Sequence, residues 1–275
     1  MATIIKETTC RSVLNKSGIG DYCVNCYTGC LHGCVYCYAR FMRRFSGHKE
    51  PWGQFVDVKV NAPEVLAKEA ARKPRGKVFV SSVCDGWQPL EEKYRLTRRC
   101  LEILIRNEFT VSILTKSTLV ARDFDVMAGC PGVSVGMTIT TLDEELRRRI
   151  ELASSPSQER IRALEEASER GIEVWAFFGP LMPFLSDTEE NLEALFRGVA
   201  ALPLTHIYVD KLNLRPQVWP SVLRCLERFY PHLIPEYRRV LFSEPDAAEH
   251  LDGVRRRVLA LADYYGLAEK MDVGL

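Results

Sequence analysis

The sequence carries almost no net charge, because 37 lysines and arginines stand against 36 aspartates and glutamates, which leaves +1 at pH 7. A protein that grips nucleic acid without sequence preference would show a clear cationic excess over the whole chain. The balance therefore excludes a strongly basic binder, while local basic patches stay open.

The sequence also lacks any run of about eighteen apolar residues, the length that a membrane-spanning helix needs. Its first residues, "MATIIKETTCRS", show no cationic stretch followed by an apolar core and a small-residue cleavage site. We therefore expect a cytoplasmic protein with no membrane partner. No low-complexity tract divides the 275 residues, of which 47% are hydrophobic, so a globular fold with a full core is expected.

Ten cysteines are present, but their spacing excludes a disulfide framework. Five of them lie between residues 23 and 37, which is too crowded for a set of cross-links. In a large cytosolic protein, clustered cysteines are typical of a metal or redox site.

Short runs that are apolar on both faces recur along the chain and predict buried parallel strands. They begin at Lys77, Phe109, Val133, Ile172 and His206, and a sixth is expected near Tyr22 to Tyr27. Amphipathic stretches of helical period lie between them.

This alternation predicts an α/β fold, a partial (β/α)6 barrel of the TIM type with a helical or irregular C-terminal extension. The expected divisions are an N-terminal extension over 1–20, the barrel over 21–214, and an extension over 215–275 packed on the barrel.

The string "YTGCLHGCVYCYAR" places Cys30, Cys34 and Cys37 with three and then two residues between them. In a parallel barrel the active groups sit on loops after the strands, and this loop follows the first expected strand. A structural zinc site would need four ligands, usually from two separated pairs. Three close thiolates instead suit an iron-sulfur cluster in which one iron lacks a protein ligand and is free to bind a substrate or cofactor.

The spacing of these cysteines resembles the signature of the radical S-adenosylmethionine (SAM) superfamily. Longer strings, such as "GCLHGCVYCYAR" and "SSPSQERIRALEEASERGIEVWAFFGPLMP", are similar to its spore photoproduct lyase-like branch, also described as DNA repair photolyase homologues. The resemblance covers roughly residues 21–196. It implies a partial βα barrel and a 4Fe-4S cluster bound by Cys30, Cys34 and Cys37.

By the same resemblance, the fourth iron is chelated by S-adenosyl-L-methionine, and reductive cleavage of this cofactor gives a 5′-deoxyadenosyl radical that abstracts hydrogen from a substrate. The implied electron source is a reductant such as flavodoxin or ferredoxin. Nucleic acid repair or modification, as in a lyase of this branch, is the first substrate class, and a peptide or a small molecule is the alternative.

The resemblance also suggests roles for residues near the cluster. Tyr36 precedes the third cysteine, where an aromatic side chain packs on the adenine. Cys84, after the second barrel strand, and Tyr38 correspond to a hydrogen-atom donor and a radical-relaying tyrosine. An inert core thiol is the alternative at Cys84, since cysteine is among the most buried residue types.

Four further residues stand at the ends of expected strands and would point to the same face of the barrel. The resemblance places Asp85 at the methionine amino group, and Lys116 with Thr138 or Thr140 at the methionine carboxylate or the ribose. The alternatives are a turn-forming role for Asp85 and a structural ion pair for Lys116.

Cys10, Cys23 and Cys26 have no place in the three-cysteine motif. They predict either an auxiliary metal or structural thiols, and they support the rival hypothesis of a non-catalytic zinc or redox metal-binding protein.

The string "RFMRRFSGHK" is a local basic and aromatic patch after the cysteine loop. Its arginines would meet phosphates while Phe41 or Phe45 stacks on a base. The simpler interpretation is a solvated helix face.

Overall fold

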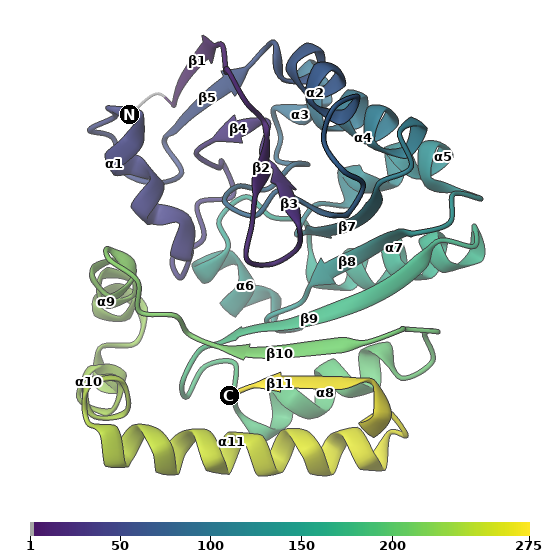
Figure 1. Cartoon of the computed structure of the whole chain (residues 1–275). Coiled ribbons are helices and arrows are strands. Elements are labelled where there is room, and N and C mark those ends of the chain that lie inside the picture. The colour runs from purple at the N-terminus through teal and green to yellow at the C-terminus, as the bar shows by residue number, and fades with distance from the viewer. Residues whose placement is uncertain (1–2) are drawn as a thin grey trace.

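The computed structural model describes residues 3–275, and its central element is a sheet of eight strands in the order β11-β10-β9-β8-β7-β6-β3-β2 (Figure 1). Six neighbouring strands run parallel to one another and curve into an incomplete barrel. They are β3 (Tyr22–Val24), β6 (Lys77–Val80), β7 (Thr110–Thr115), β8 (Val133–Thr138), β9 (Glu173–Leu181) and β10 (Ile207–Lys211). The prediction of a partial TIM-type barrel is confirmed.

Each edge of this sheet carries one more strand. β2 (Leu14–Lys16) pairs antiparallel with β3, and β11 (Met271–Gly274) pairs in parallel with β10. The C-terminal region therefore contributes a strand to the sheet in addition to its helices.

The strand expected near Tyr22 to Tyr27 is divided between two sheets. β3 ends at Val24, and β4 (Tyr27–Thr28) belongs to a second sheet of order β1-β5-β4, with β1 (Ile4–Thr8) and β5 (Phe55–Lys59). The chain turns at Asn25. Its side-chain Nδ2 donates a hydrogen bond to Ser82 Oγ at 3.1 Å, and its Oδ1 accepts one from Val83 N at 3.0 Å. The sixth barrel strand expected here is present as β3, but it is shorter than expected, because Asn25 bonds to the neighbouring loop instead of continuing the ladder.

Helices pack on the outer face of the sheet, between consecutive strands (Figure 1). In α4 the buried positions include Leu96, Cys100 and Leu104, which share one face of the helix. Gly171 follows α7 with φ +72°, a conformation that favours glycine at a helix end. These elements are α2 (Ala62–Ala70), α3 (Glu91–Tyr94), α4 (Leu96–Arg106), η2 (Thr118–Asp123), α5 (Phe124–Met127), α7 (Ser157–Glu169) and α8 (Glu189–Val199). α6 (Glu144–Ile150) instead packs against the cysteine loop.

The C-terminal region forms α9 (Val218–Phe229), η3 (Pro231–Leu233), α10 (Ile234–Phe242), α11 (Glu244–Tyr264) and η4 (Ala268–Lys270). α10 and α11 each have a proline in their first turn, where no backbone N–H donor is lost from the helix ladder. In Figure 1, α11 runs along the lower edge of the molecule, beside α8, with which it is in contact.

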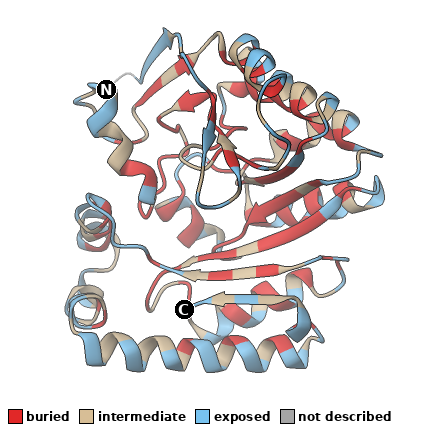
Figure 2. Ribbon diagram, in the orientation of Figure 1, coloured by how far each residue is buried: buried red, intermediate tan, exposed pale blue. Residues whose placement is uncertain are grey.

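Buried residues are concentrated on the barrel strands and on the inner faces of their helices, whereas much of α11 is exposed (Figure 2). None of the helices within residues 3–275 combines the length and the hydropathy that crossing a bilayer requires.

Candidate active site

The cysteine loop follows β4 and crosses the end of the barrel where the parallel strands have their carboxyl termini. Gly29 begins this turn with φ +94°, and a Cβ there would lie 2.3 Å from the carbonyl oxygen of Phe55. Only glycine lets the loop approach β5 this closely. η1 (Tyr38–Met42) and α1 (Arg43–Ser46) follow the loop directly.

A cavity of about 600 Å³ lies below the cysteine loop, within the volume range typical of ligand sites. It occupies the interior of the barrel. Nine of the ten residues expected to be functional line it: Cys30, Cys34, Tyr36, Cys37, Tyr38, Cys84, Asp85, Lys116 and Thr138. Thr140 is set back from the cavity and contacts Tyr36 from behind, at 3.3 Å between the hydroxyl oxygens.

The three loop cysteines are free thiols, and all three line this cavity. Burial raises the pKa of all three, to about 12 for Cys34, and repulsion from the other two thiols adds to the effect at Cys30. The Lys116 ammonium acts in the opposite direction on Cys34 and Cys37, so it favours their thiolate forms. A bound metal would complete that deprotonation, since thiolates are the form that ligates.

The donor set fits a cluster better than a single metal ion. Within residues 3–275, no three histidine, cysteine or acidic side chains converge closely enough to bind one metal ion. In a cluster each thiolate binds a different iron, so three sulfurs need not meet at one point. The soft thiolates and the adjoining cationic Lys116 suit such an anionic group.

Asp85 ties the second and third barrel strands to the cysteine loop. Its carboxylate accepts hydrogen bonds from Thr115 Oγ1 at 2.7 Å and from the backbone nitrogens of Trp87 and Lys116, and its Oδ2 lies 3.3 Å from His32 Nδ1. Burial would raise the pKa of Asp85, but His32 and these donors lower it well below its usual range. The Asp85 carboxylate is thus an anion at the cavity wall, largely engaged with the protein.

Two polar groups on the cavity wall are available to a ligand, the buried Thr138 and the partly buried Lys116. The Thr138 side chain is 1% exposed, and its Oγ1 has no hydrogen-bond partner within the described residues. Lys116 lies with Nζ 5.7 Å from the centroid of the Tyr36 ring. Burial alone would lower the pKa of Lys116, but attraction by Cys34, Glu151 and Asp85 raises it, so the side chain stays cationic.

Cys84 and Tyr38 both line the cavity. The Tyr38 hydroxyl donates to the carbonyl oxygen of Ser82, and burial raises the pKa of the Cys84 thiol to about 12. Cys84 therefore keeps its S–H bond at neutral pH, the form that a hydrogen-atom donor requires.

The remaining cysteines of the N-terminal region do not gather at one place. Cys26 is buried in the core with its Sγ 3.5 Å from Cys100 Sγ. Cys23 accepts a hydrogen bond from Asn25 Nδ2, and Cys10 is only partly buried. An auxiliary metal at Cys10, Cys23 and Cys26 stays a prediction without support from this geometry.

Several residues of the site were not anticipated. Glu151 and Arg160 form a fully buried ion pair behind Tyr36. Trp175 and His206 line the lower part of the cavity, stacked at 5.1 Å between ring centroids. The string "SSPSQERIRAL" showed helical periodicity, but nothing in one sequence indicated that Arg160 turns inward.

The basic patch after the cysteine loop meets a residue from the far end of the barrel. Arg215 lines the cavity, and its guanidinium carbon lies 5.6 Å from the centroid of Phe41. Arg44 lies 5.8 Å from the same ring and 4.6 Å from Phe45, which is 66% exposed. We call Phe41, Arg44, Phe45 and Arg215 the arginine-aromatic rim.

Comparison with known families gives a match over most of the barrel. The profile described as the radical SAM superfamily matches residues 24–197. An uncharacterized protein of Methanocaldococcus jannaschii is 39% identical over 211 residues, which cover 76% of this chain and 76% of that protein. An uncharacterized protein of Mycobacterium tuberculosis is 31% identical over 276 residues, covering 95% and 81% of the two chains.

Solved structures with the same fold include spore photoproduct lyase complexed with dinucleoside spore photoproduct. That structure has a TM-score of 0.70 at 14% identity and covers 98% of this chain and 81% of its own. Streptococcus suis SuiB bound to its precursor peptide SuiA has a TM-score of 0.55 at 12% identity, with 100% and 49% covered. At these identities the likeness concerns the fold.

Proposed function

The chain belongs to the radical SAM superfamily. On this premise we propose that it cleaves S-adenosylmethionine at a 4Fe-4S cluster bound by Cys30, Cys34 and Cys37. The purpose of this cleavage is to abstract hydrogen from a nucleic acid substrate. The bound cluster and cofactor would supply the electron and the 5′-deoxyadenosyl radical. The protein's own contribution is to bind and orient the cofactor and the substrate and to exclude water from the site.

The observation that carries this proposal is the common cavity. The three thiols, the cationic Lys116, the anionic Asp85 and the unpartnered Thr138 hydroxyl all line it. We expect Lys116 to bind the methionine carboxylate and Thr138 to bind a ribose hydroxyl, because a zwitterionic, sugar-bearing ligand would satisfy the Lys116 charge and the unpartnered Thr138 hydroxyl. Tyr36 offers an aromatic face to the adenine.

The arginine-aromatic rim supports nucleic acid as the substrate class. Arg215 lines the cavity, and the exposed Phe45 ring and the Arg44 guanidinium next to it offer a stacking face and a phosphate contact outside the cavity lining. A local rim of this kind agrees with a chain whose net charge is close to zero, because a single displaced base needs few phosphate contacts.

Anaerobic reconstitution with iron and sulfide tests the chemistry. The reconstituted protein, reduced with dithionite and given S-adenosylmethionine, should release 5′-deoxyadenosine, and C34A should release none. A reconstituted protein that holds about four irons yet cleaves no cofactor would refute the proposal, and a colourless zinc protein would favour the metal-binding rival.

A further inference from the structure

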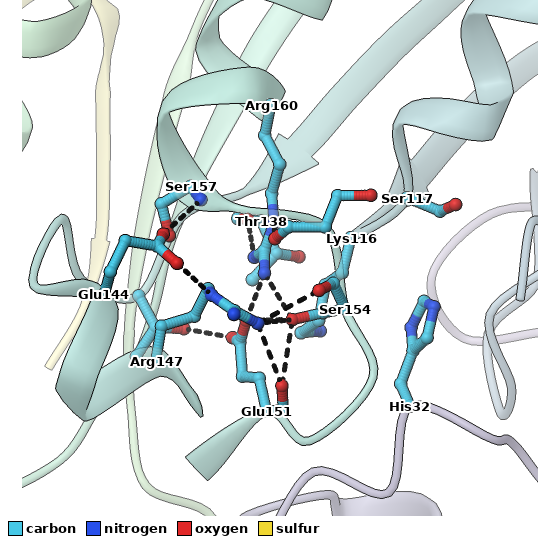
Figure 3. A network of polar contacts seen from close by, with 12 residues as sticks. His32, Lys116, Ser117, Thr138, Glu144, Arg147, Glu151, Ser154, Ser157 and Arg160 are labelled. Atoms are coloured by element: carbon cyan, nitrogen blue, oxygen red, sulfur yellow. Dashed lines mark hydrogen bonds and ion pairs between the residues drawn. The ribbon is translucent and has the colours of Figure 1, made fainter. Parts of the chain in front are cut away.

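Glu151 lies directly behind the wall of the cavity that carries Tyr36 and Lys116, and its side chain is inaccessible to solvent. It follows α6 and stands at the centre of a buried polar network (Figure 3). Isolated carboxylates are costly to bury, so a fully buried one needs partners that satisfy both oxygens.

One carboxylate oxygen of Glu151 faces the cofactor side of the network. Oε1 accepts a hydrogen bond from the Tyr36 hydroxyl, and the Thr140 Oγ1 lies 3.1 Å away. Thr140 is itself 2.8 Å from the carbonyl oxygen of Gly179, so it links β9 to the same point. The hydroxyl end of the Tyr36 ring is therefore fixed to the Glu151 carboxylate, which is buried and cannot move into solvent.

The other carboxylate oxygen faces the structural side. Oε2 accepts from Arg160 and from Ser154 Oγ at 3.0 Å. Arg160 also donates to the carbonyl oxygens of Thr138 at 2.7 Å and Ser155 at 2.9 Å. The ion pair thus connects the end of β8 to the loop before α7, as Figure 3 shows.

The segment 150–155 around Glu151 also supports the cysteine loop through its backbone. Val35 N donates to Ile150 O at 2.9 Å, Ala153 N donates to His32 O at 3.3 Å, and Ser155 N donates to Lys116 O at 3.1 Å. A single segment consequently sets the position of the loop and of the end of β7.

The charge of Glu151 also matters to Lys116. Burial would raise the pKa of Glu151, but attraction by Arg160 and Lys116, together with the hydrogen bonds, lowers it to about 2, so it is an anion at neutral pH. A buried anion in this place balances the charge of the Lys116 ammonium before any ligand binds.

We propose that Glu151 is a positioning residue for S-adenosylmethionine, fixing the Tyr36 ring through its hydroxyl and balancing the charge of Lys116, while Arg160 anchors Glu151 to β8. This rests on the proposed function, in which Tyr36 and Lys116 contact the cofactor. Glu151 itself does not line the cavity.

The test uses reconstituted protein and two readouts that do not depend on turnover. The first is a titration with S-adenosylmethionine, followed by the change in the electron paramagnetic resonance spectrum of the reduced cluster. The second is the melting temperature. We expect E151Q to weaken cofactor binding about tenfold or more and to lower the melting temperature by about 10 °C, because Arg160 and Lys116 lose their counter-charge.

A double variant separates positioning from folding. E151Q/R160M removes both members of the ion pair, so most of the lost melting temperature should return, while cofactor binding should stay weak. E144Q is the matched control, because Glu144 pairs with Arg147 at 2.7 Å on α6 without contacting Tyr36 or Lys116. It should leave the binding curve unchanged.

Y36F keeps the ring and loses only the hydroxyl that reaches Glu151. It should weaken binding about threefold or more, and adding E151Q to it should cost less than E151Q does alone, since the two act through one contact. Wild-type binding in Y36F, or recovery of binding together with stability in E151Q/R160M, would overturn the role of Glu151. A wild-type protein that binds no cofactor would overturn the proposed function as well, which distinguishes the two failures.

Discussion

The thiol of Cys84 points to the side-chain oxygen of Asn25, at 3.6 Å from Sγ to Oδ1. The same oxygen accepts a hydrogen bond from Val83 N at 3.0 Å, so it is fixed in place. Cys84 is thereby held at the cavity wall as a protonated thiol, near Tyr38 and below the cysteine loop.

We predict that C84A retains cofactor cleavage without substrate at a rate within about twofold of the wild type, because Cys84 binds neither the cluster nor the cofactor in the proposed site. The substrate product should change, since a radical left without its hydrogen donor takes another course. Mass analysis of products, with dinucleoside spore photoproduct as the first substrate offered, measures this. C100A is the control, as Cys100 is buried in the core away from the cavity. An unaltered product from C84A would make its thiol structural.

The arginine-aromatic rim predicts a preference for unpaired nucleic acid strands. F45A and R215A should each weaken the binding of a single-stranded oligonucleotide by about tenfold, because a stacking face is lost in the first and a phosphate contact in the second. Only R215A should also reduce the salt dependence of binding: the slope of the logarithm of the binding constant against the logarithm of the salt concentration should become about 0.7 less steep. Fluorescence anisotropy at several salt concentrations provides the measurement. R197A changes an exposed arginine of α8 and should behave as the wild type. Equal binding by all of these variants would argue for a peptide or small-molecule substrate.

The close approach at Gly29 predicts that one added methyl group will strongly affect iron incorporation and stability. G29A places a Cβ against the Phe55 carbonyl oxygen at a positive φ, so the cysteine loop has to move. We expect less than half of the wild-type iron to be incorporated on reconstitution and a loss of about 2 kcal/mol or more in the free energy of unfolding. G129A is the matched control, since Gly129 has φ +72° with open space around it. Similar losses from both variants would show that strain in φ, rather than contact with β5, is responsible.

The hydrogen bonds of Glu69 predict that part of the free energy of unfolding depends on pH. It binds Ser12 Oγ, the backbone nitrogens of Val13 and Leu14, and Lys73 Nζ. Burial would raise its pKa, but Lys73 and these donors lower it from 4.5 to about 2. A lowered folded-state pKa stabilises the protein above about pH 4.5, and this stabilisation is lost as the pH falls toward 2.

The stability difference between wild type and E69Q tests this account. It should be about 2 kcal/mol at most at pH 7, since the group is partly exposed, and should shrink on acidification between these values. Urea unfolding at several pH values measures it. A difference that is constant with pH would assign the effect to packing rather than charge.

The sequence was most informative where function depends on local spacing or on strand ends. The three-cysteine loop could be identified from adjacent residues alone. Lys116 and Thr138 could be placed on the cavity because parallel strands present their carboxyl ends at one edge. Both rules act over a few residues, and for that reason one sequence is enough.

The features of the site that could not be predicted depend on contacts between segments that are far apart in the sequence. Glu151 reaches Tyr36 only because the turn after α6 folds back beneath the cysteine loop, and Arg215 reaches Phe41 only because β10 ends near α1. The division at Asn25 had the same cause, since its partners Ser82 and Val83 lie in another loop. Periodicity reports which face of an element is buried, but not which remote residue it meets.

The pairing of β11 with β10 has a consequence for how the cavity is assembled. β10 carries Asp210 and Lys211 to the cavity wall, and Asn213 follows just after it. The outer edge of β10 is covered by residues 271–274, which come after α9, α10 and α11 in the chain. Pairing across so long a separation is slow, because much loop entropy has to be lost first. We therefore expect the wall nearest Arg215 to be the last part of the barrel to become rigid during folding, and an uncovered β10 edge to be the place where a shortened chain would associate with another.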